Sequence, residues 1–391
     1  MDVVLLSAVR TPVGKFLGGL SELPAPRLGA AVIAVALERA GVSPAAVDEV
    51  IMGEVVTAGV GQAPARQAAI FAGLPNTIAA VTVNKVCGSG LKVVMMAAQA
   101  IKAGDASVIV AGGMESMSRA PFLLPGVRAG YKYGDQTAKD ALILDGLWCA
   151  FENWPMGDAA EHTAKTCAIS REDQDRFSVQ SHQRAAAAWK SGAFAAETIA
   201  ITSGTGVKMV TVGQDEGIRG ESTVEGLAKL RPAFRPDGTV TAANSSQLSD
   251  GAAALVVASS DAAIKLGARP LARVVAYATS GVDPKDIFIA PVSAGRRVLD
   301  KAGLSIGDID LFELNEAFAA QMLACGRQLG LDERRVNVNG GAIALGHPIG
   351  ASGARVLTTL VHALRARSLK RGLASLCLGG GNAVAMIVET V

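Results

Sequence analysis

The stretch VNKVCGSGL, residues 83–91, places a cysteine where it could act as a nucleophile. Cys87 follows a short apolar strand and precedes a helix start that contains Gly88 and Gly90. At a helix start, unpaired backbone N–H groups and the positive end of the dipole favour thiolate over thiol. The two glycines leave room for a carbonyl group to reach the sulfur. We therefore predict that Cys87 attacks a carbonyl carbon; the alternative is a buried, inert cysteine at a turn.

The second half of the chain supplies polar groups that could assist such a cysteine. His347 lies in the glycine-rich stretch GGAIALGHPIGASGAR and is a candidate general base. Cys377 ends an apolar strand before Gly379–Gly381, where a second exposed thiol would act as an acid or base; a buried strand cysteine is the alternative. Asn315 and Glu316 end another apolar strand, where polar groups usually belong to a site.

Length and composition indicate a large α/β enzyme. The chain has 391 residues, of which 50% are apolar and 18% charged, so we expect two or three domains with well-buried cores. The net charge of +2 predicts neither a nucleic-acid partner nor a membrane surface. The longest apolar helix candidate, residues 28–37, is too short to cross a bilayer, and the N-terminus lacks the basic region of a signal peptide.

Cysteine usage predicts a reducing compartment. The five cysteines are odd in number and show no metal-binding spacing. This pattern argues against a disulfide framework and against a metal site. A cytoplasmic location fits it best.

Apolar strands alternate with helices through the first third of the chain. Glycines follow the predicted helices, as Gly41 follows residues 27–40. Strands this apolar, separated by helices, predict parallel sheets that helices cover on both faces. The expected strands are residues 3–8, 47–56, 79–86 and 105–111, the last ending at Gly112 and Gly113, and the expected helices are residues 27–40, 64–71 and 91–102.

The chain repeats itself at a spacing of about 262 residues. LERAG at 37–41 corresponds to LDKAG at 299–303, and residues 42–54 match 304–316 in their helix, turn and strand pattern. Four such pairs occur in the same order, which indicates a duplication. Two similar halves that face one another would bring their glycine-rich turns to a common centre. The remaining pairs are CGSGL at 87–91 with GASGA at 350–354, and SVIVAGG at 107–113 with SLCLGG at 375–380.

A region without this repeat interrupts the first half and forms a predicted insertion. Arg171–Lys190 has the pattern of an amphipathic helix after the capping residue Ser170. Arg119–Tyr133 is rich in apolar and aromatic residues, as is typical of a surface that meets a partner; a plain packed loop is the alternative. The predicted domains are residues 1–118 together with about 249–269, the insertion 119–248, and residues 270–391.

Taken together, these motifs resemble those of the thiolases, the acetyl-CoA C-acyltransferases. The resemblance covers the whole chain and rests on VCGSG around Cys87, NEAF at 315–318, GGAIALGHPIGASGAR at 340–355 and CLGGG at 377–381. It implies an α/β thiolase fold with five layers, αβαβα, built from two duplicated halves with an inserted loop domain. Ketoacyl synthases resemble this fold but pair the cysteine with two histidines.

The resemblance implies a covalent acyl-transfer mechanism. Cys87, deprotonated by His347, would attack an acyl-CoA thioester and form an S-acyl enzyme. Cys377 would then remove the α-proton of a second acetyl-CoA. One oxyanion hole would come from His347 and a water held by Asn315, and the other from the backbone N–H groups of Cys87 and Gly379. Coenzyme A is substrate and product, and no metal or redox cofactor is needed.

The resemblance also implies how the chain binds coenzyme A and assembles. Arg219 and the basic run Lys229–Arg235 offer local positive charge for phosphate groups; a solvated basic face is the alternative. Arg119–Tyr133 is similar to the loop that joins thiolase dimers into tetramers, so we expect a homotetramer, with a dimer as the alternative. The expected CoA-binding residues are Met156, Arg219, Ala233, Phe234, Ala242, Ser246, Leu248, Ala317 and Phe318.

Three positions near the expected substrate site depart from the pattern of biosynthetic thiolases. Pro155 stands where histidine is frequent, Gly226 stands where serine is frequent, and Phe288 replaces a glycine in the loop IFIAP at 287–291. That loop borders the acyl pocket in the family, so Phe288 could shorten or reshape the pocket. We expect acetyl and acetoacetyl substrates, with longer 3-ketoacyl chains as the alternative.

Two other classes of protein are disfavoured. A decarboxylating condensing enzyme needs a second catalytic histidine, and none of the four histidines lies in such a motif. A non-catalytic acyl-CoA-binding relative would have lost Cys87, His347 or Cys377, and all three are present.

Overall fold

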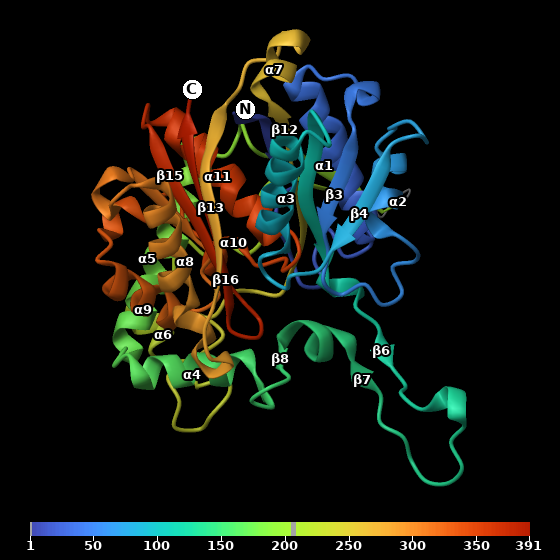
Figure 1. Cartoon of the computed structure of the whole chain (residues 1–391). Helices are drawn as coiled ribbons and strands as arrows, with labels where there is room; N and C mark the ends of the chain where they lie inside the picture. The colour runs from blue at the N-terminus through green and yellow to red at the C-terminus, as the bar shows by residue number, and fades with distance from the viewer. Residues whose placement is uncertain (1, 205–208) are drawn as a thin grey trace.

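The computed structural model describes residues 2–204 and 209–391. Within these residues, ten strands form one mixed sheet in the order β14-β15-β16-β13-β1-β12-β5-β3-β4, with β2 paired to β12 (Figure 1). The two halves of the sheet meet where β1 and β13 pair over only two residues each. The strands are β1 (Val3–Arg10), β2 (Gly14–Lys15), β3 (Glu49–Gly53), β4 (Ala79–Val83), β5 (Val108–Ser116), β12 (Ser249–Ser259), β13 (Ala272–Gly281), β14 (Leu311–Leu314), β15 (Arg371–Leu378) and β16 (Asn382–Thr390).

The order and direction of the strands show the duplication. In the first half β3, β5, β12 and β1 are successive neighbours, and in the second half β14, β15, β16 and β13 repeat this order. Each series consists of one parallel pair followed by two antiparallel pairs. The helices α1 (Ala25–Ala40) and α8 (Ala290–Ala302) both end at a left-handed glycine, Gly41 and Gly303. The predicted duplication is therefore confirmed.

One of the four sequence pairs is misaligned. Ala111 of β5 lies opposite one residue of β3, and Ala374 of β15 lies opposite the residue of β14 that occupies the same place in the repeat. Residues 107–113 therefore correspond to residues 370–376, and the predicted match to residues 375–380 is wrong. Apolar residues followed by glycines occur in both segments, but the glycines lie inside β5 in one half and form the turn after β15 in the other.

Helices and sheet form five layers. α1 and α2 pack on the outer face of the first half, α3 and α11 lie between the halves, and α8, with α9 beside it, packs on the outer face of the second half (Figure 1). The predicted αβαβα architecture is therefore confirmed. The helices are α1 (Ala25–Ala40), α2 (Pro64–Phe71), α3 (Ser89–Ala103), α4 (Met156–Thr166), α5 (Arg171–Lys190), α6 (Val224–Leu227), α7 (Ser260–Leu266), α8 (Ala290–Ala302), α9 (Ala319–Leu329), α10 (Ala342–Leu345) and α11 (Ser352–Ala366).

The prediction of purely parallel sheets is wrong. β12 runs antiparallel to β1 and β5, and β16 runs antiparallel to β13 and β15. The three residues Gly379–Gly381 join β15 to β16, and so short a connection can join only antiparallel strands. Strands covered by helices on both faces are apolar throughout in either direction, so their composition does not reveal the direction. The strand bounds differ as well: β3 and β4 are shorter than predicted, and β5 continues through the glycines to Ser116.

Glycines allow the two halves to approach each other at the starts of the middle helices. A Cβ atom at Gly353 would lie 2.2 Å from Leu91 N, and one at Gly90 would lie 3.1 Å from Gly350 O. A Cβ atom at Gly113 would lie 2.1 Å from the same Gly350 oxygen. Only a hydrogen atom fits at such distances from backbone. The glycine-rich turns therefore meet at a common centre, as predicted.

Gly353→Ala should destabilise the protein by roughly 1–3 kcal/mol, because the added methyl group would overpack the contact between α11 and α3. Gly326→Ala on α9 is the matched control, since a Cβ atom there would meet no atom within 4 Å, and alanine favours a helix more than glycine does. Urea unfolding gives the free energy of unfolding of both variants. If Gly353→Ala were as stable as the wild type, the tight contact between the halves would be refuted.

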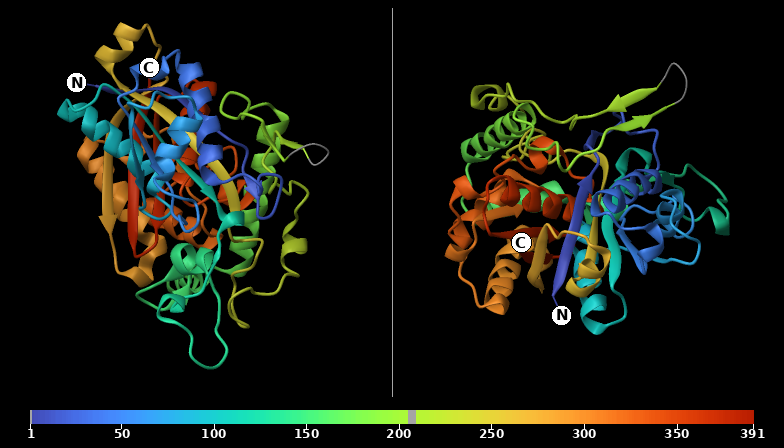
Figure 2. Two further views of the ribbon diagram at one scale, coloured as in Figure 1. Left: turned by 90° about the vertical axis from the view of Figure 1, so that its right-hand side faces the viewer. Right: turned by 90° about the horizontal axis from the view of Figure 1, so that it is seen from above.

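The described residues between β5 and β12 leave the sheet, and their later, yellow-green part lies along one side of the two halves (Figure 2). α5 begins and ends as predicted, and Ser170 Oγ accepts a hydrogen bond from Asp173 N as its N-cap. β6 and β7 form an arm that projects from the body (Figure 1). Among the described residues, no helix has the length and apolarity to cross a membrane. The short strand pairs are β6 (Phe122–Leu123) with β7 (Lys139–Asp140), β8 (Trp148–Cys149) with β9 (Trp154–Pro155), and β10 (Ile201–Ser203) with β11 (Val210–Val212).

Candidate active site

A strained turn presents Cys87 between β4 and α3. Val86 has a φ of +47°, and a β-branched residue in this left-handed region is strained. Asn84 Oδ1 accepts a hydrogen bond from Val86 N at 2.9 Å. Ser89 Oγ accepts from Lys85 N at 2.8 Å and donates to Val86 O at 2.7 Å. These side-chain bonds hold the turn, so that the Cys87 sulfur stays at the N-terminus of α3.

Burial controls the ionisation of Cys87. It raises the pKa of the thiol to about 12, although the backbone N–H groups of Cys87 and Gly379 bond to the sulfur and act in the opposite direction. The nearby Glu115 adds a smaller rise. The prediction that the helix start alone makes a thiolate is therefore wrong, because the cost of desolvating the charge exceeds the stabilisation by the helix terminus. Cys87 is a thiol in the resting protein and needs a base.

His347 is buried, and it is neutral, as a general base must be. It is 6% exposed, and burial, followed by the positive charge of Arg355, lowers its pKa to about 3. Ser352 Oγ donates to Pro348 O at 2.9 Å, so it accepts from His347 Nδ1–H at 2.6 Å. This arrangement leaves Nε2 unprotonated, 3.4 Å from Asn315 Nδ2. The imidazole is therefore neutral, and the lone pair on Nε2 accepts the hydrogen bond from Asn315 Nδ2.

Ser352→Ala should lower kcat by roughly 10- to 100-fold, because Nδ1 would lose the acceptor that fixes the tautomer and the ring orientation. Steady-state thiolysis of acetoacetyl-CoA measures this effect, and a thermal melt verifies that the variant is folded. A folded Ser352→Ala enzyme with wild-type kcat would show that the tautomer is fixed by another group.

Cys377 and Asn315 complete the cluster from the second half. Cys377 is the next-to-last residue of β15 and is 1% exposed, so the expected exposed thiol is wrong and its alternative, a buried strand cysteine, is confirmed. Phe288 and Phe318 pack in the same buried cluster. Burial, and after it the proximity of Cys87, raise the pKa of Cys377. Asn315 is fully buried, and its Oδ1 accepts no hydrogen bond from the described residues. The structure thus places the two thiols near each other, and places the amide both next to the imidazole and at the end of the strand that pairs with β15.

Both halves of the chain match one protein family. Residues 3–261 match the thiolase N-terminal domain, and residues 268–390 match the thiolase C-terminal domain. The chain belongs to the thiolase family. It is 55% identical to the acetyl-CoA acetyltransferase of Cupriavidus necator and 56% identical to that of Pseudomonas aeruginosa, with 99% and 98% of each chain covered, respectively. The structure of the Bacillus anthracis acetyl-CoA acetyltransferase superposes with a TM-score of 0.98 at 42% identity, covering 100% of this chain and 99% of that one.

Some of the expected CoA-binding residues of this thiolase lie beside the thiols. Met156, Ala317 and Phe318 pack in the cluster that contains Cys377. Leu248 packs in a second cluster, which contains Cys87. The ring centroid of Phe234 lies 6.5 Å from that of Phe318, and Ala242 is exposed. The backbone N–H groups of the other three residues donate hydrogen bonds: Ala233 to Val240 O, Ser246 to Ala317 O, and Arg219 to His182 Nδ1.

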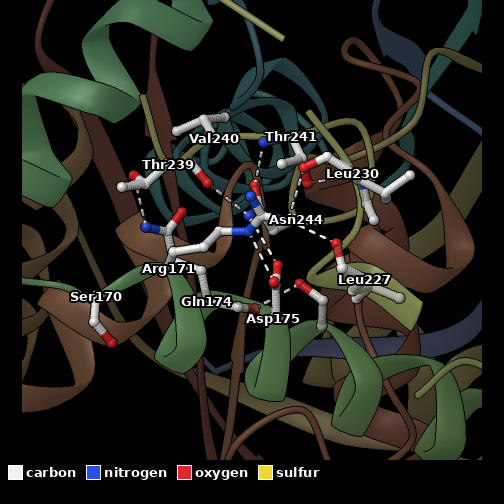
Figure 3. A network of polar contacts seen from close by, with 12 residues as sticks. Ser170, Arg171, Gln174, Asp175, Leu227, Leu230, Thr239, Val240, Thr241 and Asn244 are labelled. Atoms are coloured by element: carbon white, nitrogen blue, oxygen red, sulfur yellow. Dashed lines mark hydrogen bonds and ion pairs between the residues drawn. The ribbon is translucent and has the colours of Figure 1, made fainter. Parts of the chain in front are cut away.

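A polar network fixes the segment that carries three of these residues (Figure 3). Arg171 donates to Asp175 Oδ2 at 2.8 Å within α5, and also to Leu227 O at 2.6 Å. Asn244 Nδ2 donates to Asp175 Oδ1 at 3.3 Å. Because Asp175 is 1% exposed and bonds to both partners, it anchors the segment 227–244 to α5.

Sequence reasoning missed two residues that support the thiolase site. Ser352 fixes the tautomer of His347. Glu115 accepts hydrogen bonds from three backbone N–H groups, one of which belongs to the loop that carries His347. A serine at the start of a helix is typical of a cap, which hides its role toward His347. Among residues 2–204 and 209–391, no group of three His, Cys, Asp or Glu side chains is arranged to hold a metal ion.

Proposed function

We propose that this thiolase joins two molecules of acetyl-CoA into acetoacetyl-CoA and free CoA, and also runs the reverse thiolysis. The observation that carries the proposal is the pair of thiols: Cys87 and Cys377 are close enough for Cys87 to affect the ionisation of Cys377. Asn315, which follows the strand paired with that of Cys377, lies 3.4 Å from the neutral His347. Relatives of 55% and 56% identity over nearly the whole chain are named acetyl-CoA acetyltransferases, which supports the acetyl group as substrate.

In the first step, Cys87 attacks the thioester carbonyl of acetyl-CoA. His347 Nε2 takes the proton from the Cys87 thiol as the C–S bond forms, because a free thiolate is disfavoured in this buried site. The N–H groups of Cys87 and Gly379 hold the developing oxyanion. CoA leaves with the proton of the Cys377 thiol, so the site now holds an acetyl group on Cys87, an imidazolium and a Cys377 thiolate.

In the second step, the Cys377 thiolate removes the α-proton of a second acetyl-CoA. The enolate oxygen is held by the protonated His347 and by a water on Asn315 Oδ1, which has no partner among the described residues. The enolate carbon attacks the acetyl group on Cys87, and the Cys87 sulfur leaves with the proton of His347. Acetoacetyl-CoA is released, and both thiols and the neutral imidazole are restored.

Phe288 supports a short acyl group. Its side chain is 2% exposed, and its ring centroid lies 5.1 Å from that of Phe318 in the cluster that contains Cys377. An aromatic ring in this place occupies volume next to the reacting thiols. We therefore propose that it limits the chain length of the substrate.

Thiolysis rates test the proposed function. We expect kcat/KM for acetoacetyl-CoA to exceed that for a long-chain 3-ketoacyl-CoA by more than about 10-fold, because a filled pocket excludes additional methylene groups. A large preference for the long substrate would instead identify a 3-ketoacyl-CoA thiolase.

We propose that coenzyme A lies against the insertion, with its thioester end between Met156, Phe318 and Leu248, and its phosphate groups toward Arg219. The packing of the first three residues around Cys377 and Cys87 supports this placement. The network around Asp175 would keep the segment 227–244 in position to bind the rest of the coenzyme A molecule.

We also propose a homotetramer and a cytoplasmic location. The projecting arm exposes Phe122 at 67%, Leu124 at 53% and Tyr133 at 99%, apolar surface that a second dimer would cover. Light scattering of a Phe122→Asp, Leu124→Asp double variant should show dimers, whereas a wild-type dimer would refute the tetramer. The location follows from the two catalytic thiols, which have to stay reduced to react.

A further inference from the structure

A single buried carboxylate links the two halves of the active site. Glu115, at the end of β5, is fully buried. Its side-chain oxygens accept hydrogen bonds from Val55 N at 3.1 Å, Val56 N at 3.2 Å and Gly350 N at 2.9 Å. The first two donors follow β3 in the first half and pack in the cluster that contains Cys87. The third lies three residues after His347 in the second half, so one side chain connects the surroundings of the nucleophile to those of the base.

These three bonds favour the ionised carboxylate. A carboxylate only accepts hydrogen bonds, whereas a protonated carboxyl group directs one O–H outward and loses part of its acceptor capacity. A buried N–H group that loses its acceptor costs roughly 1–3 kcal/mol. Protonation of Glu115 would therefore favour movement of the segments that carry these N–H groups.

Among the described residues, the ionisable groups that act on the pKa of Glu115 and of its neighbour Glu54 are acidic. Burial, followed by Asp250 on β12, raises its pKa to about 7, while the three backbone N–H groups act in the opposite direction. Glu54, after β3, has a pKa raised to about 9 by burial and then by Glu115. Cys87 is a neutral thiol. Glu115 thus changes charge near neutral pH, whereas its neighbour Glu54 stays protonated there.

We propose that Glu115 is a positioning residue that holds the His347 loop in register with Cys87, and that its protonation releases this loop and slows turnover. The proposal rests on the thiolase reaction proposed above. It gives the buried carboxylate a role: its bonds hold together two loops that come from different halves of the chain.

Glu115→Gln and Glu54→Gln form a matched pair for the test. Glu54 is fully buried beside Glu115, but neither of its side-chain oxygens has a hydrogen-bond partner among the described residues. Glu54→Gln therefore removes no charge and no hydrogen bond of a neutral Glu54. In Glu115→Gln, by contrast, the NH2 group of the amide would face backbone N–H donors and could not accept from them. We expect kcat for thiolysis at pH 8 to fall about 10- to 100-fold in Glu115→Gln and to stay within about 2-fold of wild type in Glu54→Gln.

The pH profile separates positioning from a general loss of structure. In the wild type and in Glu54→Gln, kcat should decrease as the pH falls from 8 to 6, because Glu115 becomes protonated. His347 does not contribute in this range, since its pKa is about 3. In Glu115→Gln this decrease should be absent. The proposal would be overturned if folded Glu115→Gln kept wild-type kcat and the same decrease.

Hydrogen exchange of the wild type decides the question if Glu115→Gln does not fold. After correction for the intrinsic pH dependence, the amides of Val55, Val56 and Gly350 should exchange faster at pH 6 than at pH 8. Equal protection at both pH values would refute the proposal. This measurement needs no substrate, so its result does not depend on the proposed function. A protein with pH-dependent protection but no turnover at any pH would refute the thiolase reaction and leave the role of Glu115 in holding the two loops intact.

Discussion

Cys377→Ala should abolish turnover and still allow acetylation of Cys87. The variant retains the nucleophile, the base and the N–H groups of Cys87 and Gly379, so acetyl-CoA can still transfer its acetyl group, although more slowly. It lacks the only group proposed to remove the α-proton, and a lost general base typically costs about 10²–10⁴-fold. We therefore expect kcat for thiolysis and for condensation to fall by about 10³-fold or more. Steady-state rates and the intact mass after mixing with acetyl-CoA measure the two half-reactions separately.

Cys167→Ala is the control for this experiment, because Cys167 is a half-buried thiol at the end of α4, outside the clusters that contain Cys87 and Cys377. It should keep wild-type rates. A folded Cys377→Ala enzyme that still turns over within about 10-fold of wild type would show that another group moves the α-proton.

His347→Asn should lose both half-reactions. The Cys87 thiol has a pKa of about 12 in this site, so without the imidazole it would be deprotonated only rarely at neutral pH. We expect acetylation of Cys87 and overall kcat to fall together, by about 10³-fold. Parallel loss of the two rates distinguishes this variant from Cys377→Ala. Retention of rapid acetylation in His347→Asn would identify a different base.

The same variant should change the pH dependence of stability. In the native state burial lowers the pKa of His347 to about 3, whereas in the unfolded chain a histidine titrates near about 6.5. As the pH falls through this window, the unfolded state binds a proton that the native state refuses, so stability decreases. His347→Asn removes this contribution. Urea unfolding at pH 7 and pH 5 should therefore show a smaller loss of stability on acidification than in the wild type, and an equal loss would contradict the neutral, buried imidazole.

Local patterns predicted much of the architecture. The helix α5 ends where its cap and apolar spacing placed it, and the repeated LERAG and LDKAG motifs end α1 and α8 in the same conformation. These features depend on neighbours within a few residues, which a sequence displays directly. The four catalytic candidates lie at element ends or in loops: Cys87 before α3, Asn315 after β14, His347 between α10 and α11, and Cys377 near the end of β15.

Features that depend on packing in three dimensions were not predictable. The helix start suggested a thiolate at Cys87, but the burial that raises its pKa comes from residues distant in the sequence. The same holds for Cys377, which Phe288 and Phe318 bury, and for Ser352, whose position at a helix start hides its bond to His347. Strand direction was missed for a similar reason, since helices on both faces of the sheet make every strand apolar.

The most direct test of the account is rapid-quench mass spectrometry of the intact protein after brief mixing with acetyl-CoA, with Cys87→Ala as the comparison. We expect one acetyl group per chain in the wild type, located on the peptide that contains Cys87, and none in the variant. A folded wild-type protein that acquires no acetyl group, or that carries it on another residue, would contradict covalent catalysis by Cys87.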